Sequence, residues 1–267
     1  MYKFGFIGIG NMGGAIATAV ANKIGGDKII VSDIPEEKVN KAVNTLKCTK
    51  GTAEDVAKTA EYIVLGVKPQ GMKSTADSIK NILDSRKGTF VIVSMAAGIE
   101  IKVYEEFFGE SQKVIRIMPN LPAKLGMGAT VYCANKNVTG EEIDDFVVAM
   151  EKTGLVLPLE ENLINAASAI SGSGPAFVYM FAESIANAGV KCGLSEEVAL
   201  KLATQTLIGA GNMLEKEGKS PETLRIEVCS PGGTTIEGVT TLENNGFRKN
   251  IMDAIDATYQ KNFKLMK

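Results

Sequence analysis

The sequence predicts an α/β domain followed by an all-helical domain, and three observations support this prediction. The first 33 residues read as a strand, a glycine-rich turn, a helix and a second strand. Apolar runs then alternate with polar helical stretches up to about residue 160, which is typical of a parallel sheet with helical crossovers. Beyond that point the apolar residues recur at helical spacing. We therefore expect two domains, residues 1–160 and residues 161–267.

The glycine-rich turn is the most specific signal in the chain. An apolar run over residues 2–9 ends in GIGNMG at residues 8–13, a helical stretch follows, and a second apolar run stops at Asp33. In this context the first glycine permits a tight turn, the second lets the backbone approach a pyrophosphate, and the third lets the helix pack on the strand. Asp33 lies where a carboxylate can bond a ribose. The first domain is thus predicted to be a Rossmann dinucleotide-binding domain, and a glycine turn without a ligand is the less favoured alternative.

The alternation continues after Asp33 and predicts five further strands. A helix between the last two strands starts at Thr139-Gly-Glu-Glu142, which has the spacing of a capping box. The runs that predict the strands, in a parallel sheet with right-handed crossovers, span residues 62–67, 89–94, 113–118, 129–134 and 155–159.

In the helical domain, Ser195 and Ser220 are predicted helix N-caps because Glu or Pro follows each of them. An apolar stripe is predicted to be core or subunit contact; it comprises Ala176, Val178, Met180, Phe181 and Ile185.

Two glycine-containing segments of this domain are suited to a small anion. SGSGP at residues 171–175 and SPGGTT at residues 230–235 each precede a helix, whose first N–H groups have no intrahelical acceptor. Each segment could also be a capped turn without a ligand. Glycines beside the threonine pair let a ligand approach the backbone closely, which favours a functional role for the second segment.

The composition excludes several classes of function. Hydrophobic residues make up 45% of the chain and charged residues 22%, as in ordinary globular proteins. A net charge of −2 gives no basic field for nucleic acid or an anionic membrane. The longest nearly apolar run, residues 90–99, is too short to span a bilayer, and the glycine-rich start is unlike a signal peptide. We expect a cytoplasmic protein that binds neither nucleic acid nor membrane.

Histidine is absent from the chain, which removes the commonest general base and metal ligand. The scattered cysteines, Cys48, Cys133, Cys192 and Cys229, form no CxxC pair, so we expect buried free thiols and no metal site. Dinucleotide binding implies hydride transfer, but alcohol oxidation needs a base or a zinc ion. An imine nitrogen can take its proton from water, so the composition is compatible with reduction of a C=N bond.

Six blocks of the sequence resemble the pyrroline-5-carboxylate reductase family, and together they cover nearly the whole chain. The blocks are FIGIGNMGGAI at residues 6–16, GVKPQ at 66–70, SMAAGI at 94–99, RIMPNLPA at 116–123, SGSGPAFVYMF at 171–181 and CSPGGTTIEGVTTLE at 229–243. The resemblance implies a Rossmann domain, a helical C-terminal domain that builds a homodimer, and reduction of 1-pyrroline-5-carboxylate to L-proline by NADPH or NADH, the last step of proline biosynthesis.

The resemblance also implies roles for individual residues. Backbone amides of Gly233, Thr234 and Thr235 would hold the substrate carboxylate, and the Thr235 hydroxyl would bond the ring nitrogen as the catalytic group. Val228 would line the same pocket, in a site similar to one shared across a dimer interface. The residues implied to bind the cofactor are Gly8, Gly10, Asn11, Met12, Gly13, Val67, Lys68, Pro69, Ala96, Ala97, Gly98 and Asn120, the last by fixing its region of the cleft.

The cofactor preference is expected to depart from many members of that family, which favour NADPH. Asp33 lies where the 2′-phosphate of NADPH would lie, and two like charges at close range repel. Lys38 could offset this repulsion only in part. We therefore predict that NADH is used at least as well as NADPH.

Two alternatives to a pyrroline-5-carboxylate reductase stay open. A β-hydroxyacid dehydrogenase shares the GxGxMG start and a helical second domain, but its lysine base would lie where this chain has Ala176, Phe177 and Val178, and the next lysine is Lys191. The other alternative is a nucleotide-sensing protein that kept the fold and lost turnover, since one fold hosts many functions.

Overall fold

The computed structural model describes residues 1–265, which pack as two compact units. The first unit comprises residues 1–172 together with residues 259–265, and the second comprises Ser173–Thr258. The predicted domain boundary between residues 160 and 161 stays a prediction; in the packing, the change comes after Gly172.

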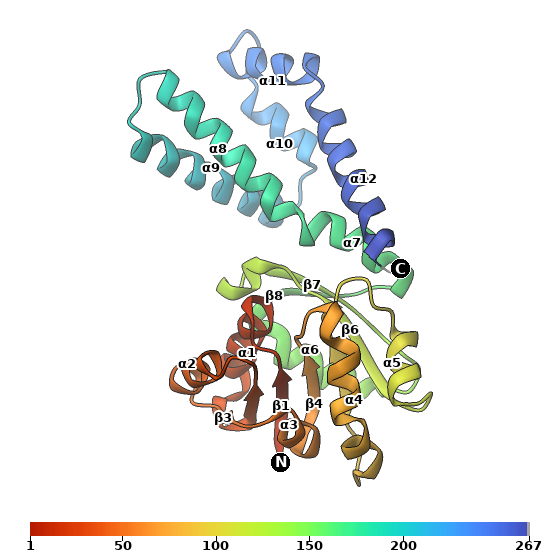
Figure 1. The fold of residues 1–267 in the computed structure, drawn as a ribbon. Helices are drawn as coiled ribbons and strands as arrows, with labels where there is room; N and C mark the ends of the chain where they lie inside the picture. Colours follow the sequence, from red (N-terminus) through yellow and green to blue (C-terminus); the bar gives the residue numbers. More distant parts are fainter. Residues whose placement is uncertain (266–267) are drawn as a thin grey trace. The chain divides into compact units, whose positions relative to one another are not determined.

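The first unit is built on one sheet of eight strands within the described chain, in the order β3-β2-β1-β4-β5-β6-β7-β8 (Figure 1). Neighbours from β3 to β6 run parallel, as predicted, but β7 runs antiparallel to β6. Only residues 119–127 join these two strands, which is too short for the crossover that a parallel pair needs. The strands are β1 (Tyr2–Ile7), β2 (Ile29–Ser32), β3 (Thr49–Lys50), β4 (Ala60–Leu65), β5 (Val91–Ser94), β6 (Lys113–Met118), β7 (Gly128–Ala134) and β8 (Gly154–Pro158).

Helices cover both faces of this sheet, which confirms the predicted α/β fold. Phe4 and Phe6 of β1 pack with α1, α2 and α6 on one face, whereas Ile63 and Leu65 of β4 pack with α3, α4 and α5 on the other. Strands buried on both faces read as nearly continuous apolar runs, and this is why the runs were recognisable. The helices of this unit are α1 (Asn11–Ile24), α2 (Glu36–Leu46), α3 (Ala53–Thr59), α4 (Pro69–Ser85), α5 (Ile101–Phe108), α6 (Gly140–Met150) and α7 (Ile164–Ala167).

Local capping sets several helix starts. At α6 the predicted capping box is confirmed: the Glu142 N–H donates to Thr139 Oγ1 over 3.3 Å, and the Thr139 N–H donates to Glu142 Oε2 over 2.9 Å. The predicted caps Ser195 and Ser220 are also confirmed, since their hydroxyl oxygens accept from the backbone N–H groups of Val198 and Thr223.

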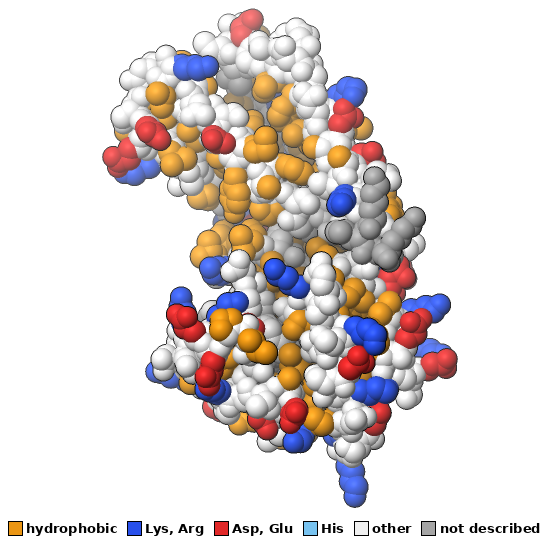
Figure 2. Space-filling model, viewed as in Figure 1, with side chains coloured by type: hydrophobic (Ala, Val, Ile, Leu, Met, Phe, Trp, Pro, Cys, Tyr) orange, Lys and Arg blue, Asp and Glu red, His pale blue; other side chains and the backbone are white. Residues whose placement is uncertain are grey.

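The second unit is helical, and residues 161–265 contain no strand, as predicted. The stripe predicted to be core or subunit contact is not core of this chain, because Val178 is 48% exposed and Met180 is 65% exposed. Figure 2 shows hydrophobic side chains gathered on the surface of this unit. The helices that form it are α8 (Gly174–Lys191), α9 (Glu196–Lys216), α10 (Pro221–Val228), α11 (Thr234–Asn244) and α12 (Phe247–Leu265), whose last turns belong to the first unit.

The predicted helix after residues 171–175 is confirmed, since α8 begins at Gly174, but a π-helical segment, Ser168–Gly172, leads into it directly. The expectation of buried cysteines is partly wrong. The cysteines are all free, but only Cys48 and Cys133 are buried; Cys192 is exposed and Cys229 is half-buried.

Candidate active site

The glycine-rich turn joins β1 to α1 at the carboxyl end of the sheet. Gly8 adopts φ +95°, a conformation that side chains disfavour, and its N–H donates to the Ser32 carbonyl of β2 over 2.8 Å. Gly10 is the N-cap of α1, which begins at Asn11 with no acidic residue in its first turn. The positive end of α1 and its first N–H groups are therefore suited to an anionic group.

The other glycines of the turn have different spatial surroundings. A Cβ placed on Gly10 would meet no protein atom within 4 Å, so the space over this residue is open to a ligand. A Cβ placed on Gly13 or on Gly66 would collide with the Gly8 carbonyl oxygen. Gly13 and Gly66 thus allow α1 and the start of the β4–α4 turn to approach β1, and the open cradle over Gly10 fits a pyrophosphate.

Asp33 lies directly after β2 and is tied to the glycine turn. Its Oδ2 accepts from the Ile9 N–H over 2.9 Å, and its Oδ1 accepts from the Ile34 N–H over 2.6 Å. These bonds hold the carboxylate beside the turn. Each carboxylate oxygen has a further lone pair with which to accept a ribose hydroxyl.

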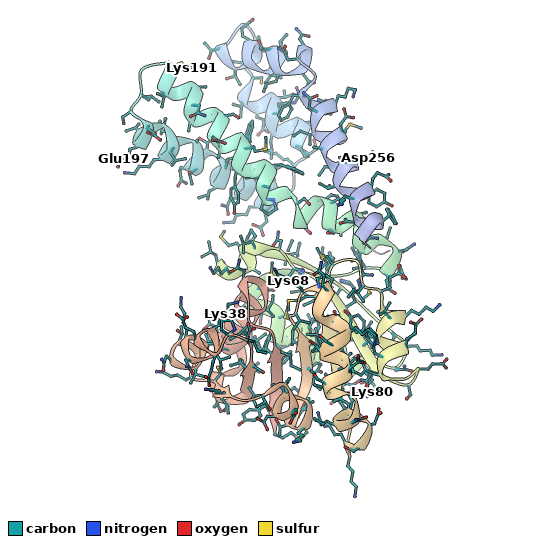
Figure 3. The ribbon with its side chains drawn as sticks, viewed as in Figure 1. Lys38, Lys68, Lys80, Lys191, Glu197 and Asp256 are labelled. Atoms are coloured by element: carbon teal, nitrogen blue, oxygen red, sulfur yellow. The ribbon has the colours of Figure 1, made fainter. Side chains whose placement is uncertain are left out.

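A pocket of about 300 Å³ lies beside this turn, between α1 and α2. Gly10, Asn11 and Gly14 line it together with apolar side chains of α1 and α2, and three basic side chains, among them Lys38 (Figure 3), also line it. Those basic side chains are Lys38, Lys41 and Lys124. These side chains give the pocket a positive charge.

The two other turns predicted to contact a cofactor follow β4 and β5. Val67 is half-buried, Lys68 is the N-cap of α4, and Pro69 is its first residue (Figure 3). Ala96 is buried, Ala97 is half-buried, and Gly98 adopts φ +77°. Because β1 lies between β2 and β4, the strand order reverses between β1 and β4, the usual ligand position in such sheets. The turn after β4 lies at this point, and the turn after β5 lies one strand further along.

Asn120 is buried and already bonded to backbone at both ends of its amide. Its Nδ2 donates to the Ser171 carbonyl over 2.9 Å, and its Oδ1 accepts from the Ala129 N–H over 2.8 Å. The side chain joins the end of the π-helical segment to the start of β7. This geometry favours the predicted role in fixing the region over direct contact with a ligand.

In the second unit, the glycine–threonine turn leads into α11. Gly233 is the N-cap, and its N–H donates to the Ser230 carbonyl over 3.0 Å. The amides of Thr234 and Thr235 follow in the first helical turn, where N–H groups lack an intrahelical acceptor. Both threonine side chains are exposed. The amides suited to a carboxylate are thus those of Thr234 and Thr235, whereas that of Gly233 serves the turn.

Val228 is the last residue of α10 and is 68% exposed. It lines an apolar pocket of about 340 Å³ together with Met213, Leu214 and Leu224. The predicted cofactor residues therefore all lie in the first unit, and the predicted substrate residues all lie in the second.

Sequence reasoning did not assign roles to Gly66, Lys41 and Lys124. Gly66 opens the block GVKPQ, but the predicted strand at residues 62–67 includes it, whereas β4 ends at Leu65, directly before it. The two lysines come from α2 and from the 3₁₀ turn Leu121–Leu125, and no local pattern links them.

A mainly parallel sheet covered by helices on both faces, with an open glycine turn where the strand order reverses, defines a dinucleotide-binding protein of the Rossmann class. A family model described as pyrroline-5-carboxylate reductase dimerisation matches residues 161–265, and one described as NADP oxidoreductase, coenzyme F420-dependent, matches residues 3–98. The pyrroline-5-carboxylate reductase of Aquifex aeolicus is 35% identical over 263 residues, covering 98% of this chain and 97% of its own. That of Escherichia coli is 35% identical over 268 residues, covering 99% and 98%.

Solved structures of the same family are also similar to this chain. The Plasmodium falciparum pyrroline carboxylate reductase with NADP bound has a TM-score of 0.88 at 33% identity, covering 100% of this chain and 98% of that one. The Coxiella burnetii pyrroline-5-carboxylate reductase has a TM-score of 0.92 at 31% identity, covering 100% and 99%. This chain belongs to the pyrroline-5-carboxylate reductase family, and its cofactor is a nicotinamide dinucleotide.

No helix among residues 1–265 is both long enough and apolar enough to cross a membrane.

Proposed function

We propose that this chain reduces 1-pyrroline-5-carboxylate to L-proline with a reduced nicotinamide dinucleotide. The similarity to named pyrroline-5-carboxylate reductases over 98% or more of the chain carries this proposal. The open cradle over Gly10 and the amide-rich start of α11 supply the two binding chemistries that the reaction needs, one for a pyrophosphate and one for a carboxylate.

In this reaction a hydride adds to the imine carbon, and the ring nitrogen takes one proton from water. The bound dinucleotide supplies the hydride. The amides of Thr234 and Thr235 would hold the ring carboxylate, and the Thr235 hydroxyl would hydrogen-bond the ring nitrogen and so fix the imine carbon for transfer. Val228 would give the ring an apolar wall. The protein's contribution is position and hydrogen bonding, since the chain contains no histidine to act as a base.

The cofactor roles fall to the first unit. The first N–H groups of α1, at Asn11, Met12 and Gly13, would bind the pyrophosphate beside Gly8 and Gly10. The turns at Val67-Lys68-Pro69 and Ala96-Ala97-Gly98 would contact the rest of the cofactor, with Asn120 fixing the segments behind them.

For the choice of cofactor, we infer that NADH is used at least as well as NADPH. The Asp33 carboxylate, held by the Ile9 and Ile34 amides, supports this inference because it would repel a 2′-phosphate. The lysines that line the neighbouring pocket would make NADPH usable as well.

The assembly would be a homodimer, or an oligomer built on one, formed through the helical unit. The match of residues 161–265 to a dimerisation model and the exposed apolar side chains of α8 support it. A cytoplasmic location and the lack of nucleic-acid partners stay predictions from the sequence.

One assay tests the reductase activity. Purified protein is mixed with 1-pyrroline-5-carboxylate and either NADH or NADPH, and loss of the reduced cofactor and formation of proline are followed together. Dinucleotide binding without turnover would instead indicate the sensor, and oxidation of hydroxyacids with NAD⁺ would indicate the dehydrogenase.

A further inference from the structure

The turn between β5 and α5 carries a buried pair of hydroxyl groups. Ser94 is the last residue of β5, and Tyr104 lies one turn into α5. Both side chains are fully buried, and their hydroxyl groups are hydrogen-bonded to each other. The Ala96 N–H donates to the Ser94 oxygen over 3.3 Å. A hydrogen-bonded path thus leads from the helix to the backbone of the turn.

The far end of the same turn is anchored separately. The Ile101 N–H, at the start of α5, donates to Glu161 Oε1 over 2.7 Å. Arg116, which pairs with Ser94 across β5 and β6, donates to the same oxygen over 3.0 Å and is 3% exposed. The residues between, 95–100, are therefore held at one end by the buried hydroxyl pair and at the other by the half-buried Glu161 carboxylate.

The position of the Tyr104 hydroxyl is fixed by packing. Its ring belongs to the apolar core beneath α4 and α5, with Phe107 edge-on at 6.4 Å between ring centroids. Burial raises the pKa of Tyr104 to about 12, so the phenol keeps its proton at neutral pH. The pair with Ser94 is a neutral hydrogen bond across the whole range in which an assay would be run.

We propose that Ser94 and Tyr104 are positioning residues that hold the turn at residues 95–100 in the conformation that binds the dinucleotide. This inference rests on the proposed function, in which Ala96, Ala97 and Gly98 contact the cofactor. Gly98 adopts φ +77°, a region where glycine itself imposes little restraint. The restraint on the turn therefore comes from its ends. Without this restraint the turn must become ordered when the dinucleotide binds, which weakens the affinity.

Tyr104→Phe tests this proposal because it removes one hydroxyl and keeps the ring. We expect the dissociation constant for NADH or NADPH, titrated by fluorescence, to rise about five- to tenfold, with the KM for 1-pyrroline-5-carboxylate within twofold of wild type. Ser94→Ala should give a similar rise. The double variant should show little further loss, since the two hydroxyl groups act as one unit.

Tyr62→Phe is the matched control. Tyr62 is 2% exposed, its hydroxyl donates to the Glu142 carbonyl over 2.8 Å, and it lies nearer the amino end of the sheet. Thermal melts should show similar losses of stability for Tyr62→Phe and Tyr104→Phe, but only the latter should weaken dinucleotide binding.

Wild-type affinity in Tyr104→Phe, equal weakening in Tyr62→Phe, or additive losses in the double variant would each overturn the proposal. Failure of the wild-type protein to reduce the imine would overturn the proposed function instead, and the dinucleotide titrations would still report on the turn.

Discussion

The two units bury very different amounts of apolar surface by themselves. The first unit has a large apolar core on each face of its sheet. In the described part of the second unit, the buried apolar cluster consists of Ala186, Ala199 and Ala203, while larger side chains such as Val178 and Met180 are exposed. A single chain therefore specifies the first unit fully, whereas the second presents an apolar surface suited to association. Substitutions in the first unit should act on the dinucleotide, and those in the second on assembly and on the imine substrate.

The largest effect is expected where assembly depends on the second unit. In the proposed homodimer, Met180→Glu should convert dimers to monomers and raise the dimer dissociation constant a hundredfold or more, because an unpaired charge would be buried at the interface at a cost of several kcal/mol. Sedimentation velocity at several protein concentrations measures this dissociation constant. Met127→Glu is the control: Met127 is 69% exposed in the first unit, against 65% for Met180. Unchanged association of Met180→Glu would show that α8 is not the interface.

The glycine turn should separate binding from stability within the first unit. Gly10→Ala should weaken dinucleotide binding at least tenfold with little change in melting temperature, because its methyl group meets no protein atom but occupies the cradle. Gly13→Ala should also lower the free energy of unfolding by about 1–3 kcal/mol, since its methyl group collides with the Gly8 carbonyl.

Calorimetric titration and thermal melts measure these two effects. The control is Gly140→Ala at the start of α6, where a Cβ also meets no atom within 4 Å. Full dinucleotide affinity in Gly10→Ala would place the pyrophosphate elsewhere.

Asp33→Ser should shift the ratio of kcat/KM values toward NADPH by about tenfold, because it removes the charge that repels a 2′-phosphate. Steady-state kinetics with both cofactors measures this ratio. Asp27→Ser, on the 3₁₀ turn before β2, should leave the ratio unchanged. A constant ratio in Asp33→Ser would mean that the carboxylate does not face the ribose, and a wild-type preference for NADPH of about a hundredfold would refute the inference about NADH.

The smallest effect belongs to the substrate turn. Thr235→Ala should raise the KM for 1-pyrroline-5-carboxylate and lower kcat/KM by about two- to tenfold, as expected for one hydrogen bond of roughly 0.5–1.5 kcal/mol, with dinucleotide affinity intact. Thr240→Ala, on the same helix, is the control. Loss of cofactor affinity alone in Thr235→Ala would contradict its assignment to the substrate.

The predictable parts of the fold are those that local sequence determines. The capping box at Thr139 and the glycine turn depend on residues a few positions apart, so their spacing alone identified them. The strand β7 was predicted, but not its antiparallel direction. Alternating strands and helices suggest parallel crossovers, and only the short connection at residues 119–127 indicates an antiparallel pair. The two-residue β3 is too short for a periodic signal.

The same distinction applies to the candidate site. The six sequence blocks could be recognised from the sequence. That the Gly233 N–H donates within its own turn could not, because this depends on the backbone path from Ser230. Ser94 and Tyr104 lie ten residues apart on different elements, and a strand followed by a helix brings their hydroxyl groups together. No local sequence pattern marks such a pair.

The chain leaves the first unit after Gly172 and returns to it at Tyr259, within α12. The helical unit is thus an insertion with two junctions, the first immediately before α8 and the second inside a continuous helix. A chimaera that exchanges this unit between relatives should add or remove no residue at either junction. One extra residue in a helix rotates everything after it by about 100° about the helix axis.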